Sequence, residues 1–161
     1  MAYTTAEILP YQNLPHEAYQ QGISDLSDDT NTSIHLALLD DNHSPDREAN
    51  NVWSDVNQHE ISGTNYSSDG KEIANITWNE DDANDRVYFD GDNVSWDNSS
   101  LTARYGVVFD YTSENASSSP LMCLLDFGGN VSSKGDEFTI KWGDAQNSPE
   151  GVFEVNYRSS E

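Results

Sequence analysis

The chain has 161 residues, of which 35% are hydrophobic and 11% aromatic, so its length suits one domain, or one domain with an arm. Its 29 acidic side chains against seven Lys and Arg give a formal net charge of −22, a field that repels nucleic acid and anionic membranes and argues against both as partners. Because salt screens such a surface, the charge favours a halophilic source over an ordinary cell.

The first 30 residues differ from the rest and are predicted to form an N-terminal arm. Residues 6–15 contain two prolines, which favour an extended segment or one broken helical turn. Pro15 then suits the first position of a short amphipathic helix. The apolar side chains at helical spacing around it are Leu14, Ala18, Tyr19, Ile23 and Leu26. The N-terminus lacks the pattern of a secretory signal, so we expect a soluble chain made in the cytoplasm.

Residues 31–161 are predicted to form a β-sandwich domain. Short runs rich in β-formers alternate with clusters of Gly, Asn, Asp and Ser, which is typical of an all-β sandwich or barrel. Long helical periodicity is missing, which argues against a βαβ sheet. A single helical turn is expected within residues 50–56. The predicted strands are residues 33–40, 72–78, 86–96, 102–111, 120–128, 137–142 and 151–157.

The run "LMCLL" at residues 121–125 is apolar at every position. A strand with apolar side chains on both faces is expected at the centre of a sheet that is covered on both sides. Cys123, the chain's single cysteine, is interpreted as a small core residue, which leaves no disulfide and no cysteine-based zinc site.

Arg104 interrupts a run that otherwise reads as a buried strand. Strict alternation places Ala103, Tyr105, Val107 and Phe109 on one face, and Arg104, Gly106, Val108 and Asp110 on the other. Two interpretations remain open from spacing alone. Arg104 lies on a solvated face beside an acidic residue, or it forms a buried or inter-subunit fork with a carboxylate.

The sequence contains no motif for nucleophilic catalysis, a zinc protease, a phosphate-binding loop or a dinucleotide site, so we do not expect an enzyme or a cofactor. Acidic residues around two turns supply oxygen atoms for a hard cation, although their order does not match an EF-hand. These weak metal candidates are Asp81, Asp82, Asp85 and Asp90. Loosely held salt cations are expected there, rather than a specific Ca²⁺ site.

Four strings occur in a distinctive order: "FDGDNVSW" from Phe89, "TARYGVVF" from Thr102, "SPLMCLLDFG" from Ser119 and "FTIKW" from Phe138. They follow a loop string E-I-S-G-T-x-Y with a later G-K at residues 60–71. This combination resembles small structural proteins encoded in the head and tail gene clusters of tailed viruses of bacteria and archaea. The resemblance extends over about residues 17–157.

The resemblance implies a virion structural protein, most simply a capsid-decorating protein of a haloarchaeal tailed virus with a jelly-roll-like antiparallel β-sandwich. The expected partners are the major capsid protein and further copies of the chain, with a trimer preferred over a pentamer. A tail-tip or fibre-associated module is the alternative within the virion. A carbohydrate-binding sandwich, with Trp53 or Tyr66 stacking on sugars, is the alternative outside it.

The resemblance also suggests roles for individual residues. Arg104 becomes a structural or interface residue, with Asp92, Asp110 and Asp126 as the suggested carboxylate partners. Trp96 and Trp142 are assigned to the same structural or interface set. The suggested capsid anchors within the N-terminal arm are Ile8, Leu9, Tyr11, Leu14 and Tyr19.

Overall fold

The computed structural model describes residues 7–11, 32–81, 86–112, 116–143 and 152–156, which form antiparallel sheets joined by loops and 3-10 turns. The all-β prediction is confirmed. The strands are β1 (Glu7–Pro10), β2 (Thr32–Leu39), β3 (Lys71–Glu72), β4 (Thr77–Asp81), β5 (Arg86–Asp90), β6 (Val94–Ser99), β7 (Thr102–Thr112), β8 (Leu121–Ser132), β9 (Asp136–Ile140) and β10 (Phe153–Asn156). The 3-10 turns are η2 (Trp53–Asp55), η3 (Asn57–His59) and η4 (Ala116–Ser118), and η2 confirms the helical turn predicted within residues 50–56.

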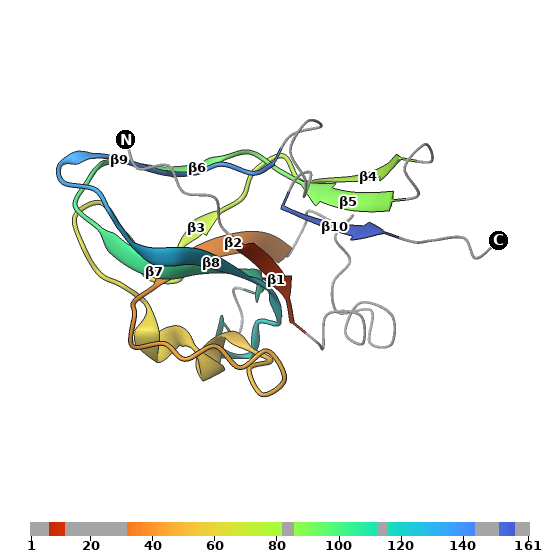
Figure 1. Cartoon of the computed structure of the whole chain (residues 1–161), viewed down its shortest axis with the longest axis horizontal. Coiled ribbons are helices and arrows are strands. Elements are labelled where there is room, and N and C mark those ends of the chain that lie inside the picture. Colours follow the sequence, from red (N-terminus) through yellow and green to blue (C-terminus); the bar gives the residue numbers. More distant parts are fainter. Residues whose placement is uncertain (1–6, 12–31, 82–85, 113–115, 144–151, 157–161) are drawn as a thin grey trace.

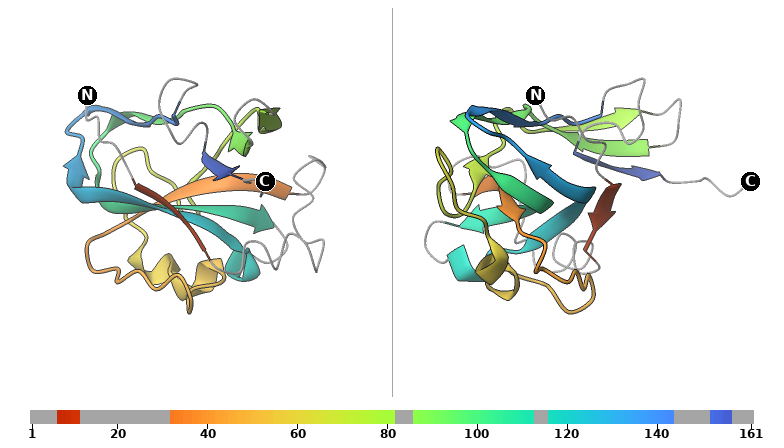
Figure 2. Two further views of the ribbon diagram at one scale, coloured as in Figure 1. Left: turned by 45° about the vertical axis from the view of Figure 1, so that its right-hand side comes forward. Right: turned by 60° about the vertical axis from the view of Figure 1, so that its left-hand side comes forward.

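The main sheet has five strands in the order β1-β8-β7-β2-β3, and a three-stranded sheet has the order β10-β5-β4. Strands β6 and β9 form a separate two-stranded ribbon. In Figure 1 the ribbon and the three-stranded sheet lie above the main sheet, and η2 and η3 lie below it. Figure 2 shows the same layers from two other sides. The main sheet is therefore covered on both faces.

The upper core lies between the main sheet and the two smaller sheets. Leu36 and Leu38 of β2 contribute to it from below, and Trp96 of β6 and Phe138 of β9 contribute from above. The rings of Trp96 and Phe138 meet edge to face with centroids 6.1 Å apart. Since a fully buried large apolar side chain is worth roughly 1.5–3 kcal/mol, this layer holds the ribbon firmly on the sheet.

The lower core lies on the opposite face of the main sheet, under the loop that contains η2 and η3. Trp53 of η2 stacks flat on Phe109 of β7, with ring centroids 4.5 Å apart and 3° between the planes. Leu39 and Leu124 complete the cluster from β2 and β8. The loop therefore acts as a packed layer of the fold.

Strand β8 confirms the prediction of a central strand with two covered faces. It pairs with β1 on one side and β7 on the other. Leu124 faces the lower core, while Cys123 and Leu125 face the upper core. Burial raises the pKa of the Cys123 thiol to about 12, so this cysteine is an unreactive core residue, as predicted.

The predicted alternation along residues 103–110 is wrong at one position. Ala103 lies in the upper core with Val108, while Val107 and Phe109 lie in the lower core. The reason is a break in the β7–β8 register, because Ala103 pairs with Val131 whereas Tyr105 pairs with Asp126. The two steps from Ala103 to Tyr105 along β7 stand opposite five steps from Val131 to Asp126 along β8, so the extra residues lie on β8. Such a bulge bends the strand and increases the local twist of the pair, which interrupts the regular alternation of the facing side chains.

The part of the predicted arm that the structure describes, residues 7–11, lies against the main sheet. Residues Glu7–Pro10 form β1, which pairs antiparallel with β8 at the edge of the main sheet. Tyr11 follows it and is 1% exposed in the lower core. The predicted amphipathic helix, including Leu14 and Tyr19, lies outside the described residues. None of the helices in the described ranges has the length and apolar character needed to cross a bilayer.

Candidate functional site

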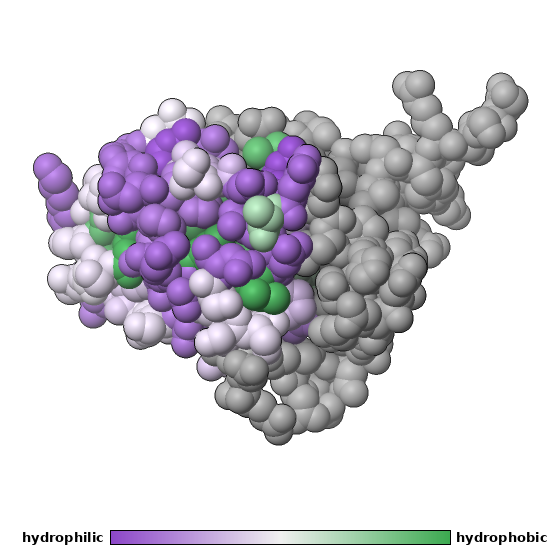
Figure 3. All heavy atoms as spheres, turned by 90° about the horizontal axis from the view of Figure 1, so that it is seen from below, coloured by the Kyte–Doolittle hydropathy of each residue, from purple (hydrophilic) through white to green (hydrophobic). Residues whose placement is uncertain are grey.

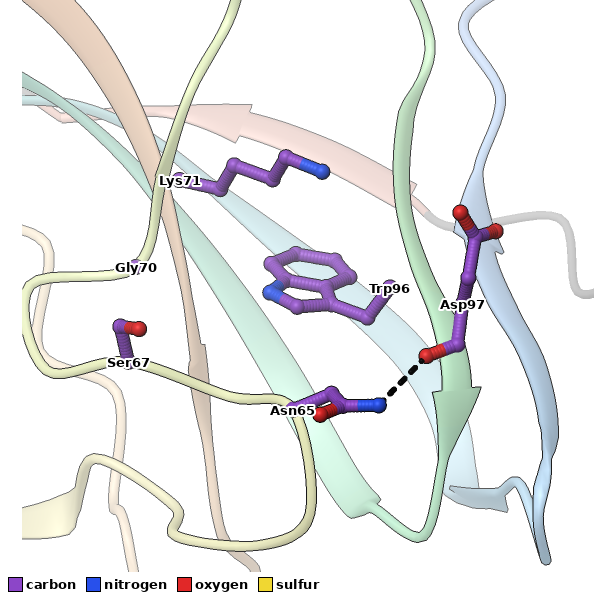
Figure 4. Close-up of a pocket in the computed structure, with 6 residues that line it drawn as sticks. All are labelled: Asn65, Ser67, Gly70, Lys71, Trp96 and Asp97. Atoms are coloured by element: carbon purple, nitrogen blue, oxygen red, sulfur yellow. Dashed lines mark hydrogen bonds between the residues drawn. The ribbon is translucent and has the colours of Figure 1, made fainter.

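The candidate site is a shallow pocket of about 230 Å³ between the loop after η3 and strand β6 (Figure 4). Its polar lining comes from two distant parts of the sequence, and the indole of Trp96 lies between them. The residues that line it are Asn65, Ser67, Gly70, Lys71, Trp96 and Asp97.

A half-buried carboxylate fixes the loop wall of this pocket. Glu60 Oε1 accepts hydrogen bonds from the Tyr66 hydroxyl at 2.9 Å and from the Gly70 amide at 3.0 Å. The Tyr66 oxygen in turn accepts the Leu38 amide of β2 at 2.9 Å. Burial raises the pKa of Glu60, and the donors around it offset part of that effect. Glu60 therefore fastens both ends of the loop to the main sheet.

Two left-handed turns bring the loop against β6. Asn65 has a φ of 62° and Asn98 a φ of 49°, a conformation that asparagine adopts more readily than most residues. The Asn65 side-chain amide donates to the carbonyl oxygens of Asp97 at 3.0 Å and Asn98 at 3.2 Å. Tyr66 also stacks on Trp96, with centroids 5.7 Å apart. The two walls of the pocket are thus joined by direct contacts.

The pocket has the chemistry of a binding site rather than a reaction centre. Its one cation, Lys71, donates to the Ser95 carbonyl oxygen at 2.6 Å. Its carboxylate belongs to Asp97, which is exposed. The lining contains no histidine or cysteine, so it offers no pair of the nucleophile–base type.

Arg104 lies on β7 and pairs with Asp126 of β8, one of the three carboxylates suggested for it. The guanidinium also sits over the Tyr105 ring, 4.3 Å from its centroid. The side chains of Arg104 and Asp126 are 20% and 30% exposed, so the pair is only partly shielded from water. The hydrogen bond from Arg104 is the main cause that lowers the pKa of Asp126.

The other two suggested carboxylates have different surroundings. Asp92 accepts a hydrogen bond from the Asn75 side chain at 2.7 Å, and its carbonyl oxygen accepts the indole N–H of Trp142 at 2.9 Å. Asp110 is fully buried on β7. Trp142 packs against the edge of the upper core, whereas Trp96 lies within it. Asp92 and Trp142 therefore fasten the turn between β5 and β6.

A double-mutant cycle on Arg104→Gln and Asp126→Asn should give a coupling of about 0.5–1 kcal/mol in the free energy of unfolding. The pair is part-exposed, so water and salt screen its attraction. Chemical denaturation of the four proteins at low and high NaCl measures the coupling, which should fall at high salt. A coupling above about 2 kcal/mol would show that the pair is dry in solution, as at a subunit interface, and would contradict this description.

A second cluster of titratable groups lies below β7. His43 is 5% exposed and meets the ring of His59 at a centroid distance of 5.3 Å and the edge of Tyr105 at 5.6 Å. His59 Nδ1 lies 3.7 Å from a carboxylate oxygen of Asp40. Burial, followed by the neighbouring His59, lowers the pKa of His43 below its ordinary value. Protonation of His43 is therefore less favourable in the folded chain than in the unfolded chain.

Replacing His43 with glutamine should flatten the acid side of the stability curve. Below pH about 6.5, His43 binds a proton in the unfolded chain but stays neutral in the folded chain. The free energy of unfolding of the wild type therefore falls by up to about 1.4 kcal/mol per pH unit, until the pH reaches the lowered pKa of folded His43. Above pH about 6.5, His43 is neutral in both states and no longer contributes to the pH dependence of stability. The free energy of unfolding of both proteins is measured in urea from pH 7.5 to 5 at fixed high salt. The difference between the two proteins removes the effect of the carboxylates, which titrate alike in both. Parallel curves for the two proteins would contradict the prediction.

The suggested anchors that the structure describes pack wholly or partly against the two cores. Ile8 packs partly against the upper core, Leu9 packs against the lower core, and Tyr11 is buried there. Their exposed apolar area is therefore smaller than a free arm would offer a capsid.

Among the weak metal candidates, the structure describes the side-chain contacts of Asp90 alone. Asp90 Oδ1 accepts the Gly91 amide at 2.8 Å, Asp81 ends β4, and Asp82 and Asp85 lie outside the described residues. No group of three or more His, Cys, Asp or Glu side chains in the described ranges is arranged to hold a metal ion.

Sequence reasoning missed the pocket, although part of its signal was present. The string E-I-S-G-T-x-Y with the later G-K contains Glu60, Tyr66 and Gly70, which fasten the loop, and Lys71, which lines the pocket. No pattern in the sequence indicated that Asp97 of β6 would line the same pocket. Trp53, suggested as a sugar platform, is 1% exposed and stacked on Phe109, so that expectation of an exposed ring is wrong.

Comparisons of the chain with protein-family models, with curated proteins and with solved structures gave no match.

Proposed function

We propose that this protein is a virion structural protein that decorates the capsid of a tailed virus adapted to high salt. The observation that carries the proposal is that the sequence strings behind the resemblance form strands and core contacts of the fold. "TARYGVVF" lies in β7, "FDGDNVSW" joins β5 to β6, and "FTIKW" includes the end of β9. Their side chains build the two cores and the Arg104–Asp126 pair, as expected of a scaffold whose task is to fold and be displayed.

The hydrophilic and acidic surface supports the proposal of a protein that is displayed on particles at high salt. Figure 3 shows the molecule from below, where hydrophilic residues dominate the coloured area and apolar ones form small, separate spots. With a net charge of −22, decorated particles would repel one another and stay dispersed. The proposed architecture is jelly-roll-like, with the major capsid protein as partner. A homotrimer is the preferred assembly and a pentamer the second choice, because closed rings suit the threefold and fivefold positions of a shell.

Quantitative mass spectrometry of gradient-purified particles tests the proposal. A decorating protein should be present in a copy number comparable with that of the major capsid protein. A few copies per particle would replace decoration with the tail-tip or fibre-associated role. Absence of the chain from purified particles would overturn both virion roles.

Salt should stabilise the isolated protein strongly. At about 0.1 M ionic strength the Debye length is about 10 Å, and at about 1 M it falls to about 3 Å, so repulsion among the 29 acidic side chains is largely removed. We expect the Tm to rise steadily over this range in NaCl. Potassium chloride at equal ionic strength should act equally if screening is the cause. A Tm that does not change with salt would contradict adaptation to brine.

A further inference from the structure

The indole N–H of Trp96 is an unsatisfied donor at the pocket. Trp96 is 4% exposed, and Figure 4 shows its ring nitrogen directed toward the wall formed by Ser67 and Gly70. The structure assigns this N–H no acceptor among the described residues. The other two indoles with described contacts are bonded, Trp53 to Asp69 at 2.9 Å and Trp142 to Asp92 at 2.9 Å. The nitrogen is not among the fully buried polar atoms that lack a partner, so it is open to the pocket, where water or an oxygen atom of a ligand can accept its hydrogen bond.

The groups around this donor are mixed in character. Lys71 uses one of its three N–H donors on the Ser95 carbonyl, and Ser67 adds an exposed hydroxyl. Acceptors come from the Asn65 amide oxygen and from the carboxylate of Asp97. Donors and acceptors therefore stand side by side around one small space, which matches a ligand that carries several hydroxyl groups.

The charges around the pocket and the volume of the pocket limit the class of ligand further. An anion would meet Asp97 and the field of a chain with net charge −22, while a cation would meet Lys71. The volume of about 230 Å³ is below the range of about 300–1,000 Å³ that is usual for drug-sized ligands. A small, uncharged molecule is therefore favoured.

We propose that this pocket, the Trp96 pocket, binds one uncharged sugar residue through hydrogen bonds from Trp96, Lys71 and Ser67 and to Asn65 and Asp97. Recognition uses the edge of the indole, because its faces are occupied by Tyr66 and the upper core. The proposal does not depend on the virion role, since it stands on the lining of the pocket alone. Binding to a single residue should be weak, with a Kd of about 1 mM or above.

The test is a titration of the ¹⁵N-labelled full chain with uncharged methyl glycosides, namely the α-methyl glucoside, mannoside and galactoside, each up to about 100 mM. The chain has four indole N–H groups, so the Trp96 signal is assigned from its loss in Trp96→Phe. We expect at least one glycoside to shift the Trp96 indole signal in a saturable way. Glycerol at the same concentration should not, because it lacks a ring that spans both walls.

Two matched variants separate binding from folding. Trp96→Phe keeps an aromatic ring beside Phe138 and should weaken binding about tenfold or more. Trp142→Phe removes an indole N–H outside the pocket and should leave the Kd unchanged. If Trp96→Phe does not fold, Ser67→Tyr provides the second variant, because Ser67 is exposed at the mouth and a large ring there should block entry.

Three outcomes would overturn the proposal. The first is no saturable shift with any glycoside. The second is an equal Kd in the wild type and in Ser67→Tyr, which would place the binding elsewhere. The third is a Trp96 shift with sodium acetate and none with the glycosides, which would make the pocket an anion site.

Discussion

Gly70→Ala is expected to lower the free energy of unfolding by about 3–5 kcal/mol, a large part of the stability of a domain of this size. Gly70 has a φ of +68°, which costs an L-residue about 1–2 kcal/mol. An added Cβ would also lie 2.2 Å from the Leu36 carbonyl oxygen and 2.7 Å from the Ala37 Cα. Because backbone atoms cannot rotate away, the loop would have to move off β2. That movement would break the Glu60 contacts and the pairing of β3 with β2.

Gly128→Ala is the matched control for that variant. Gly128 has a φ of +72°, yet an added Cβ would meet no atom within 4 Å. It should therefore show the conformational cost alone, about 1–2 kcal/mol. Chemical denaturation at high salt gives both values. Equal losses for the two variants would contradict the tight packing of Gly70 against Leu36.

Tyr11→Ala is expected to destabilise the protein by about 3–5 kcal/mol, as is usual when a buried aromatic ring is removed. The ring is 1% exposed in the lower core, and the Tyr11 amide donates to the Met122 carbonyl at 3.1 Å. Differential scanning calorimetry should show a lower Tm with a single transition. An unchanged Tm would mean that residues 7–11 act as a separate arm and do not belong to the sheet.

Tyr11→Phe serves as the control for the same position. In the described part of the chain the buried Tyr11 hydroxyl has no hydrogen-bond partner. Removing it keeps the ring and eliminates a desolvated polar group, so the free energy of unfolding should stay the same or rise slightly. A loss comparable with that of Tyr11→Ala would show that the hydroxyl, rather than the ring, holds the segment.

The strands were predictable because their side chains follow simple patterns. The apolar run around Cys123 required cover on both faces, and β8 has it. The facing of Ala103 was not predictable, since a β-bulge near Arg104 shifts the register and leaves no mark in the alternation. Strand β1 was missed because Pro10 suggested a break, although a proline is tolerated at the end of an edge strand.

The candidate site was less predictable than the fold. Its walls come from residues 65–71 and 96–97, which are far apart in sequence and meet through the left-handed turns at Asn65 and Asn98. Asparagine at such positions is a weak signal in a chain this rich in asparagine. The pairing of Arg104 with Asp126 depends on the β7–β8 register, which spacing alone does not supply.

We propose above all that this acidic β-protein is displayed on a capsid. Immunogold labelling of virus particles from the source culture, with antibody against this chain, tests it most directly. For a decorating protein we expect label distributed over the heads. Label confined to the tail, or particles without label, would contradict it.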